Sequence, residues 1–457
     1  MQKIKNRLRS VFKQTTVWLL LFCILFLLGG CMIEESSVTS TRGVENTKAS
    51  ATSNPVITVS PEITSPSAGS SLLTATPLIT PGVTVTQNEK PQITASPSQA
   101  PTSTPTPAPT PTRPVGQELS QEEICLQSMS LEQKIAQMML VSYYGNDVAV
   151  MKRAAAYGVG GLCLYAPAFK DKNKTQVRAM TQSLQDKAAV PLLISVDEEG
   201  GTVNRVSRYE ALRKEPFLSP SALYAQGGWE KVKSDTLEKA ELLLDLGINV
   251  NLAPVCDVPL SKNDYIYPRC FSMDAAETEK YIATVTEIMK QQKLGSALKH
   301  FPGYGGSNDT HKGMAYDKRP YSDFVNADFL PFIAGIEAGA DSVLVSHNIV
   351  TSMDADYPAS LSVNVHRILR QELGFDGVII TDDLSMQAIS QYTDGRNPAV
   401  QAVLAGNDLL CYAKYEEAIK AILAAVQEGI ITESRIDESV LRILRWKVNL
   451  GLQLPQG

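Results

Sequence analysis

From residue 118 to the end of the chain, short apolar runs alternate with longer stretches that have helical spacing. Short apolar runs bounded by turn residues predict strands. Runs that are apolar at every position, rather than at every second one, are typical of a parallel sheet covered on both faces. The eight runs that predict strands are Ala136–Val141, Gly160–Tyr165, Pro191–Val196, Asn249–Val255, Ser296–Lys299, Asp341–Ser346, Gly377–Thr381 and Asp408–Tyr412.

The stretches between these runs predict helices. The clearest are Lys231–Leu246, Ala275–Lys293, Phe324–Ala338, Val363–Leu373 and Tyr415–Glu428, with a last amphipathic helix from Glu433 to Leu450. Strands that alternate with helices of this length pair in parallel through crossover connections. Eight such units predict a single α/β domain, a (β/α)8 barrel of the TIM type. An open doubly wound sheet is the alternative, but no glycine fingerprint for a dinucleotide follows the first strand.

The first 30 residues have the pattern of an export signal. Five basic residues and no acidic ones are combined with an apolar run from Thr16 to Leu28, and the segment ends in Leu28-Gly29-Gly30-Cys31. The apolar run is shorter than the roughly 20 residues of a comfortable membrane span. Its end resembles the lipobox of bacterial lipoproteins, which implies lipidation of Cys31. An uncleaved membrane anchor is the alternative.

Residues 31–117 are predicted to be a lipid-anchored linker of low complexity, rich in Thr, Pro, Ser and Ala. Proline at this density prevents helices and sheet ladders, and there is too little apolar surface to offset the entropy of ordering. We expect an extended tether of about 3.1 Å per residue, with a reach on the order of 200 Å. The expected location of the domain at residues 118–457 is therefore the extracytoplasmic face of the bacterial cell membrane.

Charge and cysteine content exclude several classes of partner. The formal net charge is −6, and it becomes −11 when the five basic residues of the signal are removed, so binding to nucleic acid is not expected. The five cysteines of the domain show no C-x-x-C spacing, which predicts buried free thiols rather than disulfides or a zinc site. We expect no cofactor and a monomer.

Polar residues follow the predicted strands at their C-terminal ends. They are Asp197-Glu198-Glu199, Asp257, Lys299-His300, Ser346-His347-Asn348 and Asp382-Asp383. In a parallel barrel these ends share one face, which is where active sites of such barrels lie. The glycine-rich loop after Lys299-His300 adds Asp309 and His311, in a chain with only four histidines. The pattern therefore predicts a catalytic site.

The residue types favour glycoside hydrolysis, in which one carboxylate attacks the sugar carbon while another group protonates the leaving oxygen. Asp382 is the candidate nucleophile, although one aspartate of the Asp382-Asp383 pair is also suited to cap a helix at Leu384–Ser390. Asp309 can orient His311 for proton transfer, or both can belong to an ordinary polar loop. No metal-binding histidine spacing and no Gly-x-Ser-x-Gly elbow are present.

Four phrases of the sequence carry a family resemblance. They are Val196–Val206 (VDEEGGTVNRV), Arg269–Ser272 (RCFS), Lys299–Gly303 (KHFPG) continued by Asp309-Thr310-His311, and Gly377–Met386 (GVIITDDLSM). In this order and spacing they resemble glycoside hydrolase family 3, in particular its bacterial β-N-acetylglucosaminidases. The resemblance covers essentially the whole domain.

This resemblance implies a retaining mechanism. Asp382 matches the nucleophile that forms the glycosyl-enzyme intermediate, and Asp309 and His311 match the acid/base dyad. Residues that match substrate-binding positions are Asp197, Arg269, Lys299, His300 and, with a less defined role, His347. The implied function is exo-hydrolysis of terminal N-acetylglucosamine from cell-wall fragments or related glycans. A family 3 β-glucosidase, an N-acetylglucosaminide phosphorylase and a non-catalytic sugar-binding lipoprotein are the alternatives.

Two positions depart from the family pattern. Tyr304 stands where the phrase after Lys299 usually has a second histidine, and Glu198 stands where glutamine is common. Neither residue has a proposed catalytic role, so we expect these departures to alter the loop or the rim of the pocket.

Overall fold

The computed structural model describes residues 118–456, except for residues 307–314, 387–388, 390–391 and 394. Within this part, each predicted strand has a counterpart in one eight-stranded parallel sheet. The strands are β1 Met139–Tyr143, β2 Gly161–Leu164, β3 Leu193–Val196, β4 Val250–Asn251, β5 Gly295–Phe301, β7 Ser342–Val345, β9 Val378–Thr381 and β10 Leu410–Cys411. A small second sheet pairs β6 (Tyr316–Asp317) with β8 (Ile349–Val350).

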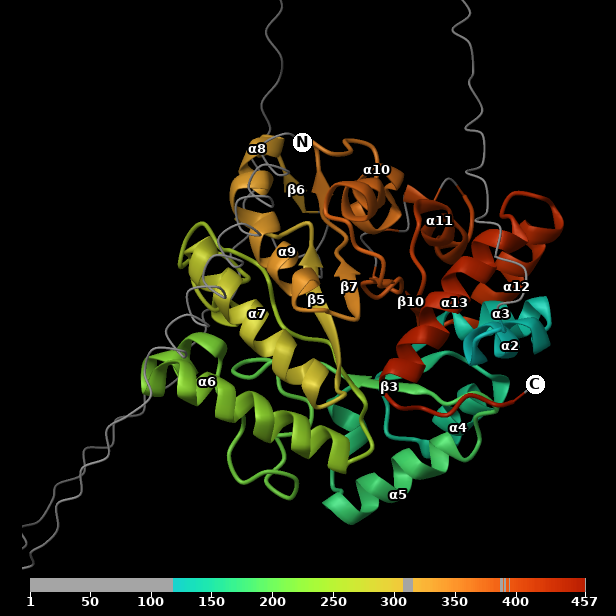
Figure 1. Ribbon diagram of the computed structural model, residues 1–457, viewed down its shortest axis with the longest axis horizontal. Helices are drawn as coiled ribbons and strands as arrows, with labels where there is room; N and C mark the ends of the chain where they lie inside the picture. Colours follow the sequence, from blue (N-terminus) through green and yellow to red (C-terminus); the bar gives the residue numbers. More distant parts are fainter. Residues whose placement is uncertain (1–117, 307–314, 387–388, 390–391, 394, 457) are drawn as a thin grey trace, which may run out of the picture. The chain divides into compact units, whose positions relative to one another are not determined.

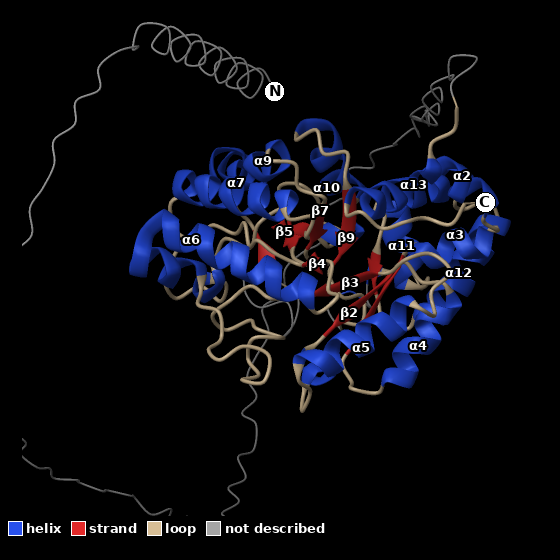
Figure 2. Ribbon diagram, turned by 60° about the horizontal axis from the view of Figure 1, so that its bottom comes forward, coloured by secondary structure: helices blue, strands red, loops and turns tan. Residues whose placement is uncertain are grey.

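The large sheet closes into a barrel. Its order is β10-β1-β2-β3-β4-β5-β7-β9. The two outer strands meet at a parallel bridge between Ile380 and Leu409, and Thr381 N donates to Leu409 O at 3.1 Å. Figures 1 and 2 show the strands at the centre with the helices around them. The predicted (β/α)8 barrel is confirmed, and the open sheet is excluded.

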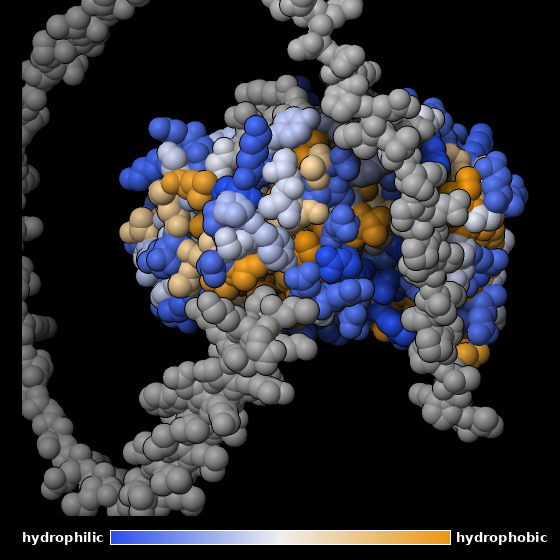
Figure 3. Space-filling model, turned by 90° about the horizontal axis from the view of Figure 1, so that it is seen from above, coloured by the Kyte–Doolittle hydropathy of each residue, from blue (hydrophilic) through white to orange (hydrophobic). Residues whose placement is uncertain are grey.

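Helices follow the strands in the order that the barrel requires, and additional helices precede β1 and end the chain. Their bounds are α2 Gln121–Ser128, α3 Leu131–Gln137, α4 Val148–Tyr157, α5 Lys174–Gln185, α6 Pro220–Asp245, α7 Ala275–Gln291, α8 Tyr321–Asp323, α9 Phe329–Glu337, α10 Val363–Arg367, α11 Pro398–Ala405, α12 Tyr415–Gln427 and α13 Glu433–Asn449. None of the helices in the described part of the chain has the length and apolar character of a membrane span. On the face seen in Figure 3, hydrophilic residues cover much of the described surface, with hydrophobic groups between them.

Some predicted strand boundaries are wrong for local reasons. Ala136 belongs to α3 rather than to the first strand, because Ser130 and Gln133 cap that helix reciprocally and it continues to Gln137. The fourth strand is shorter than predicted, and Pro254, which has no N–H for a ladder, lies in its missing part. The fifth strand continues past Lys299 to the fully buried Phe301.

The helix predictions also need correction. The helix predicted from Lys231 starts at Pro220, where Ser219 caps it, and it contains a break with non-helical backbone at Gly227 and Gly228. A π-helical turn precedes α9, and another follows α10. After Asp382-Asp383, at the start of the helix predicted at Leu384–Ser390, Leu384 and Ser385 form a turn and Met386 a bend, while residues 387–388 and 390 lie outside the described part.

A large hydrophobic core fills the barrel and the space beneath the helices, and a small second cluster contains Val255, Ile266, Cys270 and Tyr304. Ile194, Leu298, Val343 and Ile379, from four different strands, are completely buried in the large core. Each such side chain contributes about 1.5–3 kcal/mol relative to an exposed one. The five cysteines of the domain are buried free thiols, as predicted.

The N-terminal end of the barrel has a structural role. Asp408, fully buried just before β10, accepts hydrogen bonds from Ile379 N at 3.0 Å and from Ser439 Oγ at 2.7 Å. The guanidinium groups of Arg370 and Arg442 also contact this carboxylate. These contacts connect β9, α13 and the residue before β10 at the N-terminal end of the barrel, where polar residues contribute to stability rather than to catalysis.

Lys447 of α13 is fully buried, and its Nζ donates to Gln137 Oε1 at 2.7 Å. Burial lowers its pKa to about 7. In the unfolded chain a lysine has a pKa of about 10.4, so between these values the unfolded state binds more protons and stability rises with pH.

Lys447→Met should remove this pH dependence, because methionine fills similar space without a charge. We expect the variant to be about 2 kcal/mol more stable than the wild type at pH 6–7, with the difference shrinking toward pH 10. Urea unfolding at several pH values measures this. Lys420→Met, at an exposed position of α12, is the matched control. Equal differences at pH 7 and pH 10 would contradict the assignment.

Candidate active site

The predicted site residues gather at the C-terminal ends of neighbouring strands. Phe301, Val345 and Thr381 are in register across β5, β7 and β9. Asp382, the next residue after Thr381, donates from its backbone N to Val345 O at 2.9 Å. His300 and Asp382 therefore lie at the same end of the barrel.

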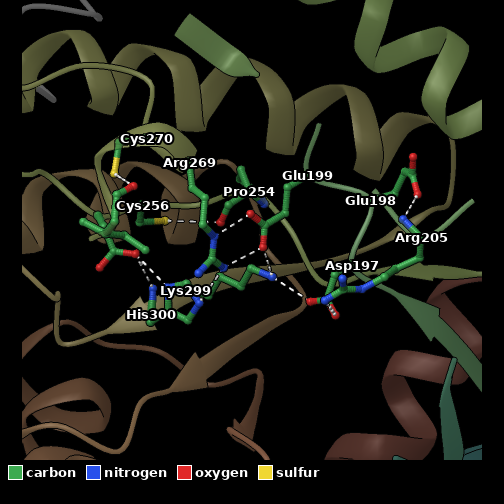
Figure 4. A network of polar contacts seen from close by, with 12 residues as sticks. Asp197, Glu198, Glu199, Arg205, Pro254, Cys256, Arg269, Cys270, Lys299 and His300 are labelled. Carbon is green, nitrogen blue, oxygen red and sulfur yellow. Dashed lines mark hydrogen bonds and ion pairs between the residues drawn. The ribbon is translucent and has the colours of Figure 1, made fainter. Parts of the chain in front are cut away.

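Lys299 lies between two carboxylates at the centre of the site (Figure 4). Its Nζ is 2.8 Å from Asp197 Oδ1 and 2.6 Å from Glu199 Oε1, and its side chain is only 2% exposed. Arg269 binds Glu199 with two hydrogen bonds, of 2.8 Å from Nε and 2.7 Å from Nη2. Two cations and two anions thus balance one another where water is largely excluded.

A register shift in β5 explains how two successive residues join the same network. Successive side chains of a regular strand point to opposite faces. Between Lys299 and Phe301 the pairing with β7 shifts, and such irregularities re-aim side chains next to active sites. Lys299 contacts Asp197 and Glu199, while His300 contacts Arg269, which itself binds Glu199.

The hydrogen bonds of His300 identify its tautomer. Nη2 of Arg269 lies 3.0 Å from His300 Nε2, and because arginine can only donate, Nε2 accepts. Nδ1 therefore carries the proton and donates to Asp257 Oδ2 at 2.7 Å. The same carboxylate accepts from the backbone N of His300 and of Tyr304, at 3.1 and 2.7 Å. Asp257 thus orients the histidine and the start of the loop after it.

The electrostatics of the network favour the charged forms of its carboxylates. Burial raises the pKa of Glu199, but Arg269 and Lys299 lower it by more, and the net pKa lies well below the ordinary value. Burial likewise raises the pKa of Asp197, and Lys299 and Arg205 lower it below its usual range. Burial lowers the pKa of Lys299, while Asp197 and Glu199 raise it by more. Asp197, Lys299, Glu199 and Arg269 therefore form a row of alternating negative and positive charges that is in place before any ligand binds.

The two departures from the family pattern have structural roles. Glu198 is fully buried and accepts hydrogen bonds from the backbone N of Arg205, Val206 and Ser207 and from the Ser207 hydroxyl. It holds this loop. Tyr304 is buried with its ring edge-on to His300, at 5.1 Å between ring centres.

The contacts of the aspartate pair differentiate its members. Asp383 is 3% exposed; its Oδ1 accepts from Ser385 N at 2.8 Å and its Oδ2 from the Tyr144 hydroxyl at 2.6 Å. Asp382 is half-buried, and its Oδ1 accepts from Asp383 N at 2.9 Å. Asp383, rather than Asp382, therefore makes the turn contact that was expected of a cap.

His347 is completely buried. Its Nε2 donates to the backbone oxygen of Asp383 at 3.0 Å, and its Nδ1 accepts from the Ser360 hydroxyl at 2.7 Å. This geometry supports the segment that carries the aspartate pair. Contact between His347 and substrate stays a prediction.

Asp309 and His311 lie outside the described residues, as does Cys31. Asp197, Arg269, Lys299 and His300 are brought together, and their binding roles stay predictions. The sequence interpretation noted Glu199 and Asp257 at strand ends but did not assign them to the site. The position of Glu199 two residues after Asp197 was the available signal. Among the described residues, no group of three or more His, Cys, Asp or Glu side chains is arranged to hold a metal ion.

Glu199→Gln should destabilise the protein by about 3 kcal/mol, because it leaves Lys299 and Arg269 with less compensating charge. Glu230→Gln, which breaks the exposed pair with Lys233, is the control and should change stability by less than about 0.5 kcal/mol. Urea unfolding at pH 7 measures both. Equal effects of the two changes would contradict the account of the network.

The same measurement has a defined pH dependence. Because the folded-state pKa of Glu199 is lowered, its stabilising effect is fully present above the unfolded pKa of about 4.3. It is lost as the pH falls toward the lower folded-state value. The difference between the wild type and Glu199→Gln should therefore shrink in acid.

Comparisons with known proteins agree with the fold. A protein named "Beta-hexosaminidase" from Xanthomonas campestris pv. campestris (strain B100) is 33% identical over 258 residues, which cover 55% of this chain and 76% of that protein. The solved family 3 β-N-acetylglucosaminidase from Paenibacillus sp. str. FPU-7 is 32% identical with a TM-score of 0.66, over 71% of this chain and 63% of that one. The match thus spans less than two thirds of the Paenibacillus chain.

The β-N-acetylhexosaminidase structure from Beutenbergia cavernae DSM 12333 is 26% identical with a TM-score of 0.62, and 70% of this chain and 99% of that one are covered. Residues 130–446, more than half of the chain, match the family described as "Glycosyl hydrolase family 3 N terminal domain". The chain therefore belongs to glycoside hydrolase family 3.

Proposed function

We propose that the protein is a retaining exo-β-N-acetylglucosaminidase that removes terminal N-acetylglucosamine from cell-wall fragments or related glycans. The observation that carries this proposal is the placement of Asp382 at the same barrel end as the network of Asp197, Lys299, Arg269 and His300. Relatives named as β-hexosaminidases and β-N-acetylglucosaminidases support the choice of sugar.

The charged network suits the recognition of a sugar's hydroxyl groups. A carboxylate such as Asp197 can accept from two adjacent hydroxyls, whereas Lys299 and Arg269 can only donate. The ion pairs hold each of these groups in place before substrate binds, so little reorganisation is needed. Binding of a single terminal sugar through its hydroxyl groups is consistent with exo-cleavage.

The proposed reaction has two steps. In the first, an Asp382 oxygen attacks the anomeric carbon, the bond to the leaving oxygen breaks, and His311 supplies a proton to that oxygen. In the second, His311 takes a proton from water, the water oxygen attacks the same carbon, and the Asp382 carboxylate is released. Asp309 orients the imidazole. Two inversions retain the anomeric configuration.

Asp382→Ala should lower kcat on an aryl β-N-acetylglucosaminide by about 10⁴-fold or more, because the covalent step loses its nucleophile. Asp376→Ala, at an exposed position before the start of β9, is the matched control and should retain activity. A steady-state assay with the aryl β-glucoside alongside decides between sugars. Full turnover by Asp382→Ala would exclude this nucleophile, and preference for the glucoside would exclude the proposed substrate.

His311→Ala should lower activity about 10²–10⁴-fold on a disaccharide, whose leaving oxygen needs a proton. The loss in leaving-group release should be smaller with a dinitrophenyl glycoside, because that leaving group departs as an anion. Pre-steady-state release of dinitrophenol compared with disaccharide turnover measures the difference. Equal losses on both substrates would argue against an acid/base role. A rate that depends on added phosphate would indicate a phosphorylase.

We also propose that Cys31 carries a lipid and attaches the enzyme to the outer face of the cell membrane. The signal-like residues 1–30 and the lipobox motif support this. Cys31→Ala should move the protein from the membrane fraction to the medium or to unprocessed precursor, as measured by fractionation and immunoblot. An unchanged membrane-bound mature form would exclude lipidation at this residue.

A further inference from the structure

Tyr144, directly after β1, makes a contact that the proposed mechanism does not yet use. Its hydroxyl donates to Asp383 Oδ2 at 2.6 Å, although the two residues are 239 positions apart in the sequence. The residue as a whole is 54% exposed, so the ring is not part of the core. A hydrogen bond of 2.6 Å from an exposed tyrosine to an almost fully buried carboxylate indicates a role other than packing.

Tyr165, after β2, holds Tyr144 in place. The two rings stack with centroids 4.0 Å apart and an interplanar angle of 25°, and the hydroxyl oxygens are 3.2 Å apart. Because the single Tyr144 proton goes to a carboxylate, which can only accept, the Tyr165 hydroxyl is the donor of the second bond. Burial and the Asp383 carboxylate raise the pKa of Tyr144, so it remains protonated and a donor at neutral pH.

Asp383, which accepts the bond from Tyr144, is also hydrogen-bonded to Asp382. Its own backbone N donates to Asp382 Oδ1 at 2.9 Å. Its backbone oxygen accepts from His347, and its Oδ1 accepts from Ser385 N. Asp383 is thus held through its side chain and its backbone, while its amide holds one carboxylate oxygen of Asp382.

The stacked tyrosines also border the sugar-binding network. The Arg205 guanidinium lies over the Tyr165 ring, 5.4 Å from its centre, and its Nη2 is 3.4 Å from Asp197 Oδ2. A continuous path of contacts therefore runs from Asp197 through Arg205, Tyr165 and Tyr144 to Asp383. This path connects the charged network around Lys299 with the aspartate pair at 382–383.

We propose that Tyr144 is a positioning residue for the nucleophile: through its bond to Asp383 it orients the Asp382 carboxylate for attack. This rests on the proposed function of Asp382. A displacement of about 1 Å of a reacting group can cost 10²-fold in rate. Loss of one bond in a turn that His347 and Ser385 still hold should cost less, about 10-fold in kcat.

Tyr144→Phe is the direct test, because it keeps the ring and the stacking and removes only the hydroxyl. Tyr157→Phe is the matched control: its hydroxyl donates to Glu132 Oε1 at 2.9 Å, also a tyrosine–carboxylate bond, but between α3 and α4. We expect kcat of Tyr144→Phe to fall about 10-fold with KM within about twofold, whereas Tyr157→Phe retains wild-type kcat. Melting temperatures of the two variants should agree within about 2 °C.

A double-mutant cycle tests the path of the effect. If Tyr144 acts through Asp383, Tyr144→Phe combined with Asp383→Ala, which removes the accepting carboxylate, should lose no more activity than Asp383→Ala alone. Additive losses would overturn the proposal. So would a wild-type kcat in Tyr144→Phe, or a change confined to KM, which would indicate direct contact with substrate.

Hydrogen exchange gives a readout that needs no substrate. Mass spectrometry should show faster amide exchange over residues 382–385 in Tyr144→Phe than in the wild type or in Tyr157→Phe. Unchanged exchange there would overturn the proposal whatever the sugar specificity. If the wild type hydrolyses neither aryl glycoside, the proposed function fails, and the exchange comparison still decides whether Tyr144 holds this turn.

Discussion

All eight strands of the large sheet run in the same direction, so all of them end at the same end of the barrel. Among the described candidate site residues, Asp197, Lys299, His300 and Asp382 lie there. This follows from parallel closure, which joins β9 to β10 and returns β10 to β1. Residues as distant in sequence as Tyr144 and Asp383 become neighbours for that reason. At the opposite end, Asp408 and its arginines stabilise the barrel.

The charged side chains of Lys299, Asp197 and Glu199 are largely buried at this end of the barrel, and burying a charge is costly unless it is paired. Lys299 stays charged at 2% side-chain exposure because Asp197 and Glu199 lie within hydrogen-bonding distance. Replacing such a group with apolar residues is often neutral or stabilising in proteins, so stability alone does not explain it. A network of fixed donors and acceptors at the site instead fits the binding of a polyhydroxylated ligand.

Much of this architecture was predictable because it depends on local pattern. Continuous apolar runs predicted the eight strands. The polar positions that follow these runs gave Asp197, Lys299, His300 and Asp382 as candidate site residues, which the structure places at the same end of the barrel. Boundaries were less predictable: Ala136 belongs to a capped helix, and β5 continues past Lys299. These ends depend on which neighbour supplies hydrogen bonds, which a single segment does not encode.

The sequence alone did not identify which side chains contact one another across the barrel. The pairing of Glu199 with Arg269 and of Asp257 with His300 joins loops that only the fold brings together. For the same reason the sequence left open which aspartate of the 382–383 pair makes the structural contact, and the bonds from Ser385 N and the Tyr144 hydroxyl assign it to Asp383. His347, predicted to contact substrate, is buried and donates to the backbone oxygen of that residue, and its contact with substrate stays a prediction.

The proposed covalent bond between Asp382 and the sugar is tested most directly by trapping the glycosyl-enzyme intermediate. A slow fluorinated N-acetylglucosaminyl substrate would be incubated with the wild type and with Asp382→Ala, followed by proteolysis and peptide mass spectrometry. We expect one N-acetylhexosamine-derived adduct on the peptide that contains Asp382, and none in the variant. An adduct on a different residue, or turnover with inverted anomeric configuration and no adduct, would contradict it.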